Sequence, residues 1–333
     1  MAMDEFLKPK VIISKCIEFE HCRWNGNIIK SDLVRVLKPF IEFIPVCAEV
    51  EIGLGVPRDP VRIVKINGLK LIQPSTMKDL TDNMRNYTSK FLSSVQDADG
   101  FLLKFKSPSC GIYETKYYYD EKPGSAVIEK GPGLFGSAVI DKYPYLAIET
   151  EARLTNFRIR EHWLTKLYTL RAYRAIKESK THHNLVEFHS RNKLLFMGYN
   201  QVLMRKMGKT VGNTSKKKID LVLQEYEKLL LEILEYPPKY TSHINVLMHV
   251  LGYFKKNLSN NEKAFFLDEL EKYRAGWIPL FVLNNLISSW IVRFDQPYLK
   301  KQSYFNPYPQ DLMNFDLMDT WRGRSYWKKL EKD

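Results

Sequence analysis

The sequence has few cysteines, few glycines and prolines, and no long apolar run. Its 333 residues include 4 Cys, 16 Gly and 16 Pro. Four cysteines are too few for a disulfide scaffold, and the glycine and proline content excludes a collagen-like or low-complexity chain. A hydrophobic share of 44% excludes an intrinsically disordered one. The chain is therefore expected to be compact and ordered, and its length predicts two domains.

Segments that could cross or enter a membrane are also missing. No stretch approaches the roughly 20 uncharged apolar residues of a membrane span. Residues 1–10 contain acids and lysines where a signal peptide needs an apolar run. These features predict a cytoplasmic protein without a membrane partner. Because the cytoplasm keeps thiols reduced, metal binding or catalysis is favoured for the cysteines.

Acidic residues are scarce in the second half of the chain. Residues 1–150 contain 20 Lys+Arg and 19 Asp+Glu, whereas residues 151–333 contain 31 and 19. Most of this excess lies in residues 153–218, with 16 basic and 3 acidic side chains. Such a segment is typical of a surface that binds a polyanion, since each neutralised phosphate releases counterions. A solvated basic surface without a partner is the alternative.

Short apolar runs alternate with amphipathic stretches over the first 150 residues or so. This alternation predicts an α/β domain with a mainly parallel sheet. Ser31 is expected to cap a short helix, because it directly precedes the apolar positions of that stretch. The predicted strands cover residues 11–14, 40–46 and 101–105, and the predicted helices cover residues 31–38 and 77–95.

From about residue 156 the apolar residues recur at helical spacing almost to the end. Breaks are expected at 208–215, 237–238 and 257–261, where glycine, proline or asparagine interrupts the pattern. The sequence thus predicts an all-α domain over residues 176–333 behind an α/β domain over residues 1–175. The predicted helices cover 158–177, 183–206, 217–234, 241–258, 261–274 and 278–294.

Three of the four cysteines, Cys16, Cys47 and Cys110, follow predicted strands. The carboxyl ends of parallel strands share one edge of a sheet, where ligands bind, so these thiols could converge. Cys22 lies six residues after Cys16 and either reaches the same edge or faces away. The spacings fit neither a zinc site nor a ferredoxin run. Ordinary buried cysteines at strand ends are the alternative.

Two further polar residues accompany the cysteines. Glu49 follows Cys47 by two residues, and Ser109 precedes Cys110 in the run SPSCG. Glycine-rich turns follow at residues 53–57 and 131–136, where the backbone can approach a bound group. A carboxylate, a hydroxyl and three thiols near one edge of the predicted sheet form a candidate site. Alternatively, Glu49 is solvent-exposed and the turns are purely structural.

Five segments over residues 8–170 closely resemble the thiouracil desulfidase family: VIISKCIEFEHCRWNG, PVCAEVEIGLGVPRDPVRIV, LLKFKSPSCG, GPGLFG and ARLTNFRIREHW. The resemblance implies a 4Fe-4S cluster held by Cys16, Cys47 and Cys110, whose fourth iron takes sulfur from a thiocarbonyl nucleobase. It also implies catalytic roles for Glu49 and Ser109. Cys22 matches a family cysteine and is a candidate fourth ligand or catalytic thiol.

The sequence departs from the family at two places near these motifs. Ala48 stands where the family commonly has proline, and Ala152 stands where it usually has glycine. Both departures concern the geometry of loops.

Residues 181–312 resemble a domain of formerly unknown function that is fused behind this desulfidase. The matching segments are EFHSRNKLLFMGYN, NVLMHVLGYFKKNL, EKYRAGWIPLFV and PYLKKQSYFNPYP. The fused arrangement is similar to that of desulfidases that act on 4-thiouridine in tRNA. Residues 313–333 form an extension without an assignment.

The basic segment contains the candidate RNA-binding residues. His189 is predicted to contact phosphate together with Arg191 and Lys193, whereas a metal site at His182, His183 and His189 is disfavoured, because histidines on a basic helix more often contact solvent or phosphate. The predicted phosphate-binding face consists of Arg191, Lys193, Arg205, Lys206 and Lys209.

The leading hypothesis is an iron–sulfur desulfidase that converts 4-thiouridine in tRNA to uridine and hydrosulfide without net redox change. One alternative substrate is free thiouracil or a thionucleotide, with a structural helical domain. Another alternative is a non-catalytic nucleic-acid-binding protein with a structural metal. The sequence leaves the oligomeric state open.

Overall fold

The computed structural model describes residues 6–122, 124–212 and 218–313. Residues up to Arg171, with the short helix α14 (Gln310–Met313), form one compact unit, and residues 172–308 form a second. The chain passes from the first unit to the second within helix α5 (Phe157–Ser179). No helix in the described ranges is long and apolar enough to cross a membrane.

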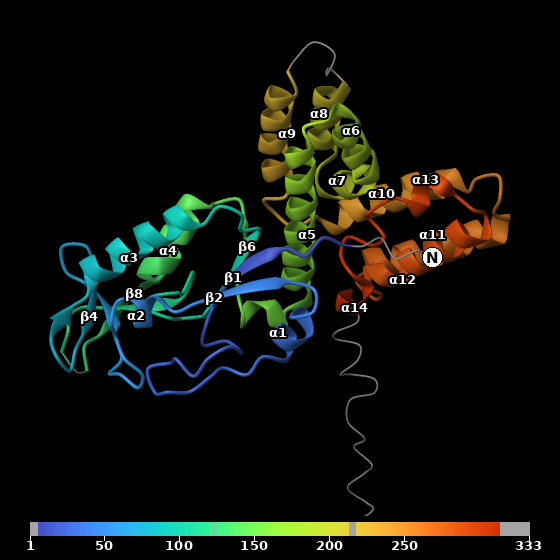
Figure 1. Ribbon diagram of the computed structural model, residues 1–333. Coiled ribbons are helices and arrows are strands. Elements are labelled where there is room, and N and C mark those ends of the chain that lie inside the picture. Colours follow the sequence, from blue (N-terminus) through green and yellow to red (C-terminus); the bar gives the residue numbers. More distant parts are fainter. Residues whose placement is uncertain (1–5, 123, 213–217, 314–333) are drawn as a thin grey trace, which may run out of the picture. The chain divides into compact units, whose positions relative to one another are not determined.

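The first unit is built on a four-stranded parallel sheet of order β2-β1-β6-β9, of which Figure 1 labels β1, β2 and β6. Val11, Ile13 and Phe101 on its central strands are completely buried, because both faces of the sheet are covered. The α/β prediction is confirmed, and the three predicted strands are correct to within two residues. The strands are β1 (Lys10–Ser14), β2 (Glu42–Val46), β6 (Gly100–Leu103) and β9 (Ala147–Thr150).

The carboxyl ends of β1, β2 and β6 lie at the same level. Ser14 at the end of β1 is aligned with Val46 at the end of β2. The hydroxyl of Ser14 also accepts a 2.9 Å hydrogen bond from the backbone N–H of Lys104, the residue after β6. The loops that follow these three strands therefore start side by side.

Four helices accompany the strands of this unit: α1 (Asp32–Leu37), α2 (Ala48–Glu51), α3 (Thr81–Ser94) and α4 (Leu134–Lys142). The Ser31 side chain accepts from the N–H of Val34, which confirms the predicted cap. Helix α3 begins four residues later than predicted, because the preceding residues form strand β5. Helices α3 and α4 pack against each other (Figure 1).

A second sheet of five strands, of order β5-β4-β3-β7-β8, was not predicted. Its strands have two to five residues each. Runs this short carry little alternation that could be detected in the sequence. They are β3 (Arg62–Lys65), β4 (Leu69–Gln73), β5 (Lys78–Asp79), β7 (Thr115–Tyr118) and β8 (Val127–Gly131).

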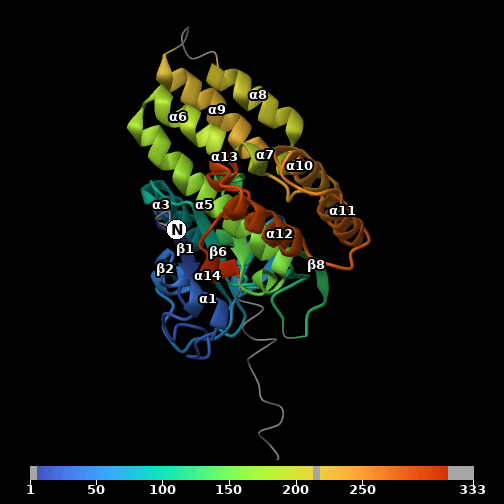
Figure 2. The ribbon, with the colours of Figure 1, turned by 90° about the vertical axis from the view of Figure 1, so that its right-hand side faces the viewer.

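The described part of the second unit is entirely helical, which confirms the all-α prediction. Figure 2 shows α8 beside α9, and these two helices pack together. The helices from α6 onward are α6 (His182–Arg191), α7 (Lys193–Tyr199), α8 (Gln201–Gly212), α9 (Ile219–Ile233), α10 (Tyr240–Tyr253), α11 (Asn260–Arg274), α12 (Leu280–Arg293) and α13 (Pro297–Lys300).

The predicted single helix over residues 183–206 is wrong. Two asparagines divide the segment into α6, α7 and α8. The Asn192 amide donates to the carbonyl of Phe188 at 2.8 Å, and the Asn200 side chain accepts from the N–H of Leu203 at 3.1 Å. The side-chain bonds form beside backbone bonds that remain at the breaks, from the N–H of Asn192 to the carbonyl of Phe188 and from the N–H of Met204 to the carbonyl of Asn200. Helix α8 then continues to Gly212, and the rest of the break expected at 208–215 lies outside the described residues.

Candidate active site

The loops after β1, β2 and β6 enclose a pocket of about 390 Å³ in the first unit. This volume is in the range of small-molecule sites. Its position at the carboxyl ends of parallel strands is where open α/β sheets bind ligands. The lining includes four thiols, one carboxylate and five cations: Cys16, Cys22, Cys47, Cys110, Glu49, Lys15, Arg23, Arg58, Lys104 and Lys106.

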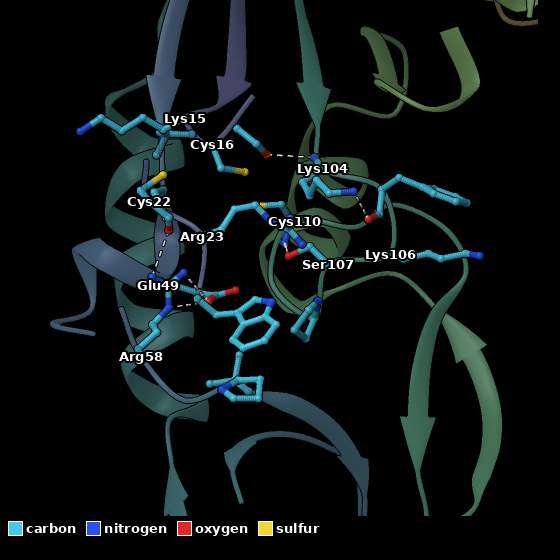
Figure 3. A pocket seen from close by; sticks show the side chains of 18 residues that line it. Lys15, Cys16, Cys22, Arg23, Glu49, Arg58, Lys104, Lys106, Ser107 and Cys110 are labelled. Atoms are coloured by element: carbon cyan, nitrogen blue, oxygen red, sulfur yellow. Dashed lines mark hydrogen bonds and ion pairs between the residues drawn. The ribbon is translucent and has the colours of Figure 1, made fainter. Parts of the chain in front are cut away.

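All four cysteines line this pocket, and Figure 3 labels Cys16, Cys22 and Cys110. Cys47 is the first residue after β2 and the N-cap of α2. Its thiol donates to the carbonyl oxygen of Cys22 at 3.9 Å. The N–H of Cys110 donates to the Ser107 hydroxyl at 3.1 Å, which shapes the loop after β6. Cys22 thus faces the same pocket as the other three cysteines rather than away from it.

The thiols influence one another and are shielded from water. Contact with the Cys16 side chain, followed by burial, raises the pKa of Cys22 to about 11. The neighbouring Cys22 and burial raise the pKa of Cys47 strongly. Burial raises the pKa of Cys110 to about 12. The raised pKa values favour neutral thiols at neutral pH, and a bound cation would favour the thiolate forms.

The described residues contain no group of three or more His, Cys, Asp or Glu side chains placed to hold a single metal ion. The donor set is nevertheless one of thiols alone, which is the set that iron–sulfur clusters use.

Glu49 lies on α2 within the pocket and accepts hydrogen bonds on both carboxylate oxygens. Arg58 donates to Oε2 from Nη2 at 2.7 Å and from Nε at 2.9 Å. Ser109 donates to Oε1 from its hydroxyl at 2.8 Å. The carboxylate is only 13% exposed and the guanidinium 6%, so this ion pair is shielded from water. Figure 3 shows Glu49 and Arg58 joined in this way below Cys22.

Ser109 is completely buried and is not part of the pocket wall, whereas its neighbour Ser107 is. The Ser109 hydroxyl is engaged with Glu49, so it supports the carboxylate instead of facing a ligand. Gly133 and Gly136 make this packing possible. A Cβ atom on Gly133 would lie 2.4 Å from the carbonyl oxygen of Ser109.

Several pocket residues were not predicted from the sequence. Lys104 is held by Glu151 at 2.6 Å and by its neighbour's carbonyl at 2.8 Å. Trp24 is 45% exposed at the pocket wall, next to Arg23, which points into the pocket in Figure 3. Arg58, Lys104 and Trp24 all stand within the segments that resemble the desulfidase family. Their position in these segments could have marked them as site residues, but their spacing in the sequence indicated no role.

The five predicted phosphate-binding residues are exposed on the second unit: Arg191, Lys193, Arg205, Lys206 and Lys209. Four of them, all but Arg191, have no carboxylate partner in the part of the chain that the structure describes. Arg205 and Lys209 are one turn apart on α8. Gly208, next to Lys209, is the point where α8 approaches α6 closely, since a Cβ atom there would lie 3.2 Å from His189.

The prediction that His189 contacts phosphate is wrong. Its ring is 9% exposed and its Nδ1 lies 3.1 Å from the hydroxyl of Tyr226. Burial lowers the pKa of His189 to about 4, so the ring is neutral at physiological pH. A neutral, buried imidazole packed among aromatic rings stabilises the helical core and offers no charge to a phosphate.

Two family models match the chain, one for each part. Residues 11–151, which contain the whole pocket, match the 2-thiouracil desulfurase family. Residues 193–309 match DUF1722, a family of unknown function. The two matches do not overlap, and each covers less than half of the chain. The boundary between the two matches falls in the segment that contains α5 and α6.

Curated relatives and a solved structure cover parts of the chain. The chain is 28% identical to YbgA of Escherichia coli over 155 residues, 46% of this chain and 92% of that protein. It is 28% identical to YbbK of Bacillus subtilis over 128 residues, 35% of this chain and 85% of that protein. The structure of the [4Fe-4S]-dependent thiouracil desulfidase TudS is 25% identical, covers 44% of this chain and 94% of that one, and gives a TM-score of 0.36.

Proposed function

We propose that the protein is a 4Fe-4S-dependent desulfidase that converts 4-thiouridine in tRNA to uridine and hydrosulfide. The observation that carries this proposal is the pocket of the desulfurase domain. It combines four cysteines with a carboxylate that is fixed by an arginine and a serine. In the overall reaction, water supplies the new carbonyl oxygen, and the sulfur leaves as hydrosulfide with a proton, so no oxidant or reductant is needed.

The residues of the pocket suit an iron–sulfur cluster. Cys16, Cys47 and Cys110 come from three separate loops and would supply three thiolates, while buried thiols that raise one another's pKa gain from a cation between them. A cluster spreads its ligands over several irons, so three thiolates from separate loops can each bind a different iron. When bound, it would supply an open iron, a Lewis acid that polarises the thiocarbonyl.

Glu49 is the group placed to move protons in this pocket. Its carboxylate lines the cavity and is held on both oxygens, so it can accept a proton from an attacking water without changing position. Lys104, fixed by Glu151, adds positive charge to the same wall, which favours the anionic sulfur that leaves. The pocket is large enough for one pyrimidine ring.

The helical domain supports an RNA substrate. It presents basic side chains to solvent from α6 to α8, and most of those predicted to bind phosphate have no carboxylate partner within the described ranges. A base inside a folded RNA must be extruded to reach such a pocket, and phosphate contacts outside the pocket would hold the RNA during this step.

Free 2-thiouracil is the second candidate substrate, because the matched family is described as a 2-thiouracil desulfurase. A direct experiment separates the two. The protein is purified without oxygen, its iron and sulfide are quantified, and sulfide release is measured with thiolated tRNA and with free thiouracil. A cluster-loaded protein that releases sulfide faster from tRNA supports the proposal. Release from the free base alone supports the second candidate, and no release from either contradicts both.

A further inference from the structure

Arg58, to which the sequence assigned no role, donates hydrogen bonds to several parts of the pocket. Its Nε and Nη2 donate to Glu49 Oε2 at 2.9 and 2.7 Å. Its Nη1 donates to the carbonyl oxygens of Cys22 at 3.0 Å and of Gly55 at 3.2 Å. Its backbone N–H donates to the carbonyl of Trp24 at 2.7 Å. One residue thus ties together the Cys22 loop, the catalytic carboxylate and the turn after α2.

These contacts require an arginine. The guanidinium has five N–H donors in a planar fork, and the structure uses donors on all three of its nitrogens. A lysine ammonium carries the same charge at one point and cannot reach Glu49 and Cys22 along separate directions. The side chain is only 6% exposed, so water would not replace the lost bonds equally well.

The hydrogen bonds also distinguish the two oxygens of Glu49. A carboxylate has about four acceptor positions, two on each oxygen. Arg58 occupies two on Oε2, and the Ser109 hydroxyl occupies one on Oε1. The remaining position is on Oε1. Oε1 is therefore the oxygen available to a water molecule in the pocket.

We infer that Arg58 is the positioning residue of the site, which fixes Glu49 so that Oε1 serves as the proton acceptor. This inference rests on the proposed desulfidase function. It predicts that loss of Arg58 lowers kcat and leaves KM little changed, because the guanidinium holds the carboxylate and is not required to touch the substrate. Misplacement of a catalytic group by about 1 Å typically costs about 100-fold in rate.

The test compares Arg58→Ala, Arg58→Lys and the control Arg62→Ala, each loaded anaerobically, by iron and sulfide content and by turnover of thiouracil. Arg62 is on the neighbouring strand β3, donates to the carbonyl of Lys122 at 3.2 Å and does not line the pocket. We expect all three variants to retain the cluster. Both Arg58 variants should lose about 100-fold in kcat. Guanidinium chloride at low concentration should restore part of the activity of Arg58→Ala only.

A double variant with Glu49→Gln completes the test. If Arg58 acts through Glu49, adding Arg58→Ala to Glu49→Gln should lower kcat only slightly further. Three outcomes would overturn the inference. The first is that the two losses in kcat are fully additive, and the second is that Arg58→Ala keeps the wild-type kcat. The third is that both Arg58 variants lose the cluster and guanidinium does not restore activity. If cluster-loaded wild-type protein releases no sulfide from any thiolated substrate, the proposed function itself fails, which is a different outcome.

Discussion

The two units use polar residues in opposite ways. In the first unit, ionised and sulfur-bearing side chains line one pocket, where Glu49 and Arg58 are almost completely shielded from water. In the helical unit, residues 172–308 contain 21 Lys+Arg and 12 Asp+Glu, and the predicted phosphate-binding cations face solvent. In that unit the buried His189 ring has the hydroxyl of Tyr226 as its hydrogen-bond partner.

Buried and exposed charges act on a bound molecule in different ways. Buried charges that face a cavity act strongly on a bound molecule, because the surrounding dielectric is low. Exposed charges act weakly one at a time and suit a long polyanion, whose binding sums many weak contacts. The first unit is therefore expected to determine the reaction, and the second to determine how strongly an RNA is bound.

The strongest test of this division is Cys47→Ser. A site with three thiolate ligands has no spare one, so we expect complete loss of the cluster and of sulfide release from every substrate. Iron and sulfide analysis and visible absorption would measure this. Cys22→Ser is the matched control in the same pocket, and we expect it to retain iron with reduced turnover. Full cluster content and normal activity in Cys47→Ser would refute the ligand assignment.

The next largest effect is expected for Glu49→Gln. This change removes the proton-accepting group and keeps the shape of the side chain, so the cluster should persist while kcat falls by about 100-fold or more. Stopped-flow turnover of free thiouracil at saturating concentration measures it. Glu51→Gln, two residues further on the same short helix and outside the pocket wall, serves as control. Equal turnover in wild type and Glu49→Gln would leave Glu49 with a structural role.

A smaller effect, limited to RNA, is expected from the helical unit. Neutralising the predicted phosphate-binding face should weaken tRNA binding and reduce the log–log salt slope by roughly 0.7 to 0.9 per lost contact. Turnover of free thiouracil should not change. Substituting the exposed lysines Lys90 and Lys116 of the first unit is the control. Equal losses on tRNA and thiouracil would show damage to the fold or cluster. The substituted residues are Arg191, Lys193, Arg205, Lys206 and Lys209.

The last prediction concerns stability and not activity. The pKa of His189 is about 4 in the folded protein, against about 6.5 in an unfolded chain. As the pH falls from 6.5 toward 4, the unfolded state takes up a proton that the folded state excludes, so the helical unit should lose up to about 3 kcal/mol.

Urea denaturation at pH 7 and pH 5 measures this loss. His189→Leu should weaken the pH dependence, whereas the same change at the exposed His183 should not. A pH dependence that is identical in His189→Leu and wild type would show that another group titrates.

Local patterns predicted a large part of the fold. The buried strands around Val11 and Phe101 read as continuous apolar runs because parallel strands are covered on both faces. Short strands such as β5 were missed, since two residues carry no periodicity. The breaks at Asn192 and Asn200 were missed because asparagine also occurs within helices. The Asn200 side chain accepts from the N–H of Leu203 at the start of α8, whereas at the start of α7 the N–H of Leu194 donates to Gln302, a residue distant in sequence.

The sequence was enough to predict that Cys16, Cys47 and Cys110 reach one pocket, because position after a parallel strand fixes the edge of the sheet at which a loop emerges. Counting charged residues was likewise enough to distinguish a nearly neutral first half from a basic second half. Which side chains contact one another could be seen only in the folded chain. The pairing of Arg58 with Glu49, the burial of Ser109 behind that carboxylate and the inward turn of His189 depend on directions set by residues distant in sequence.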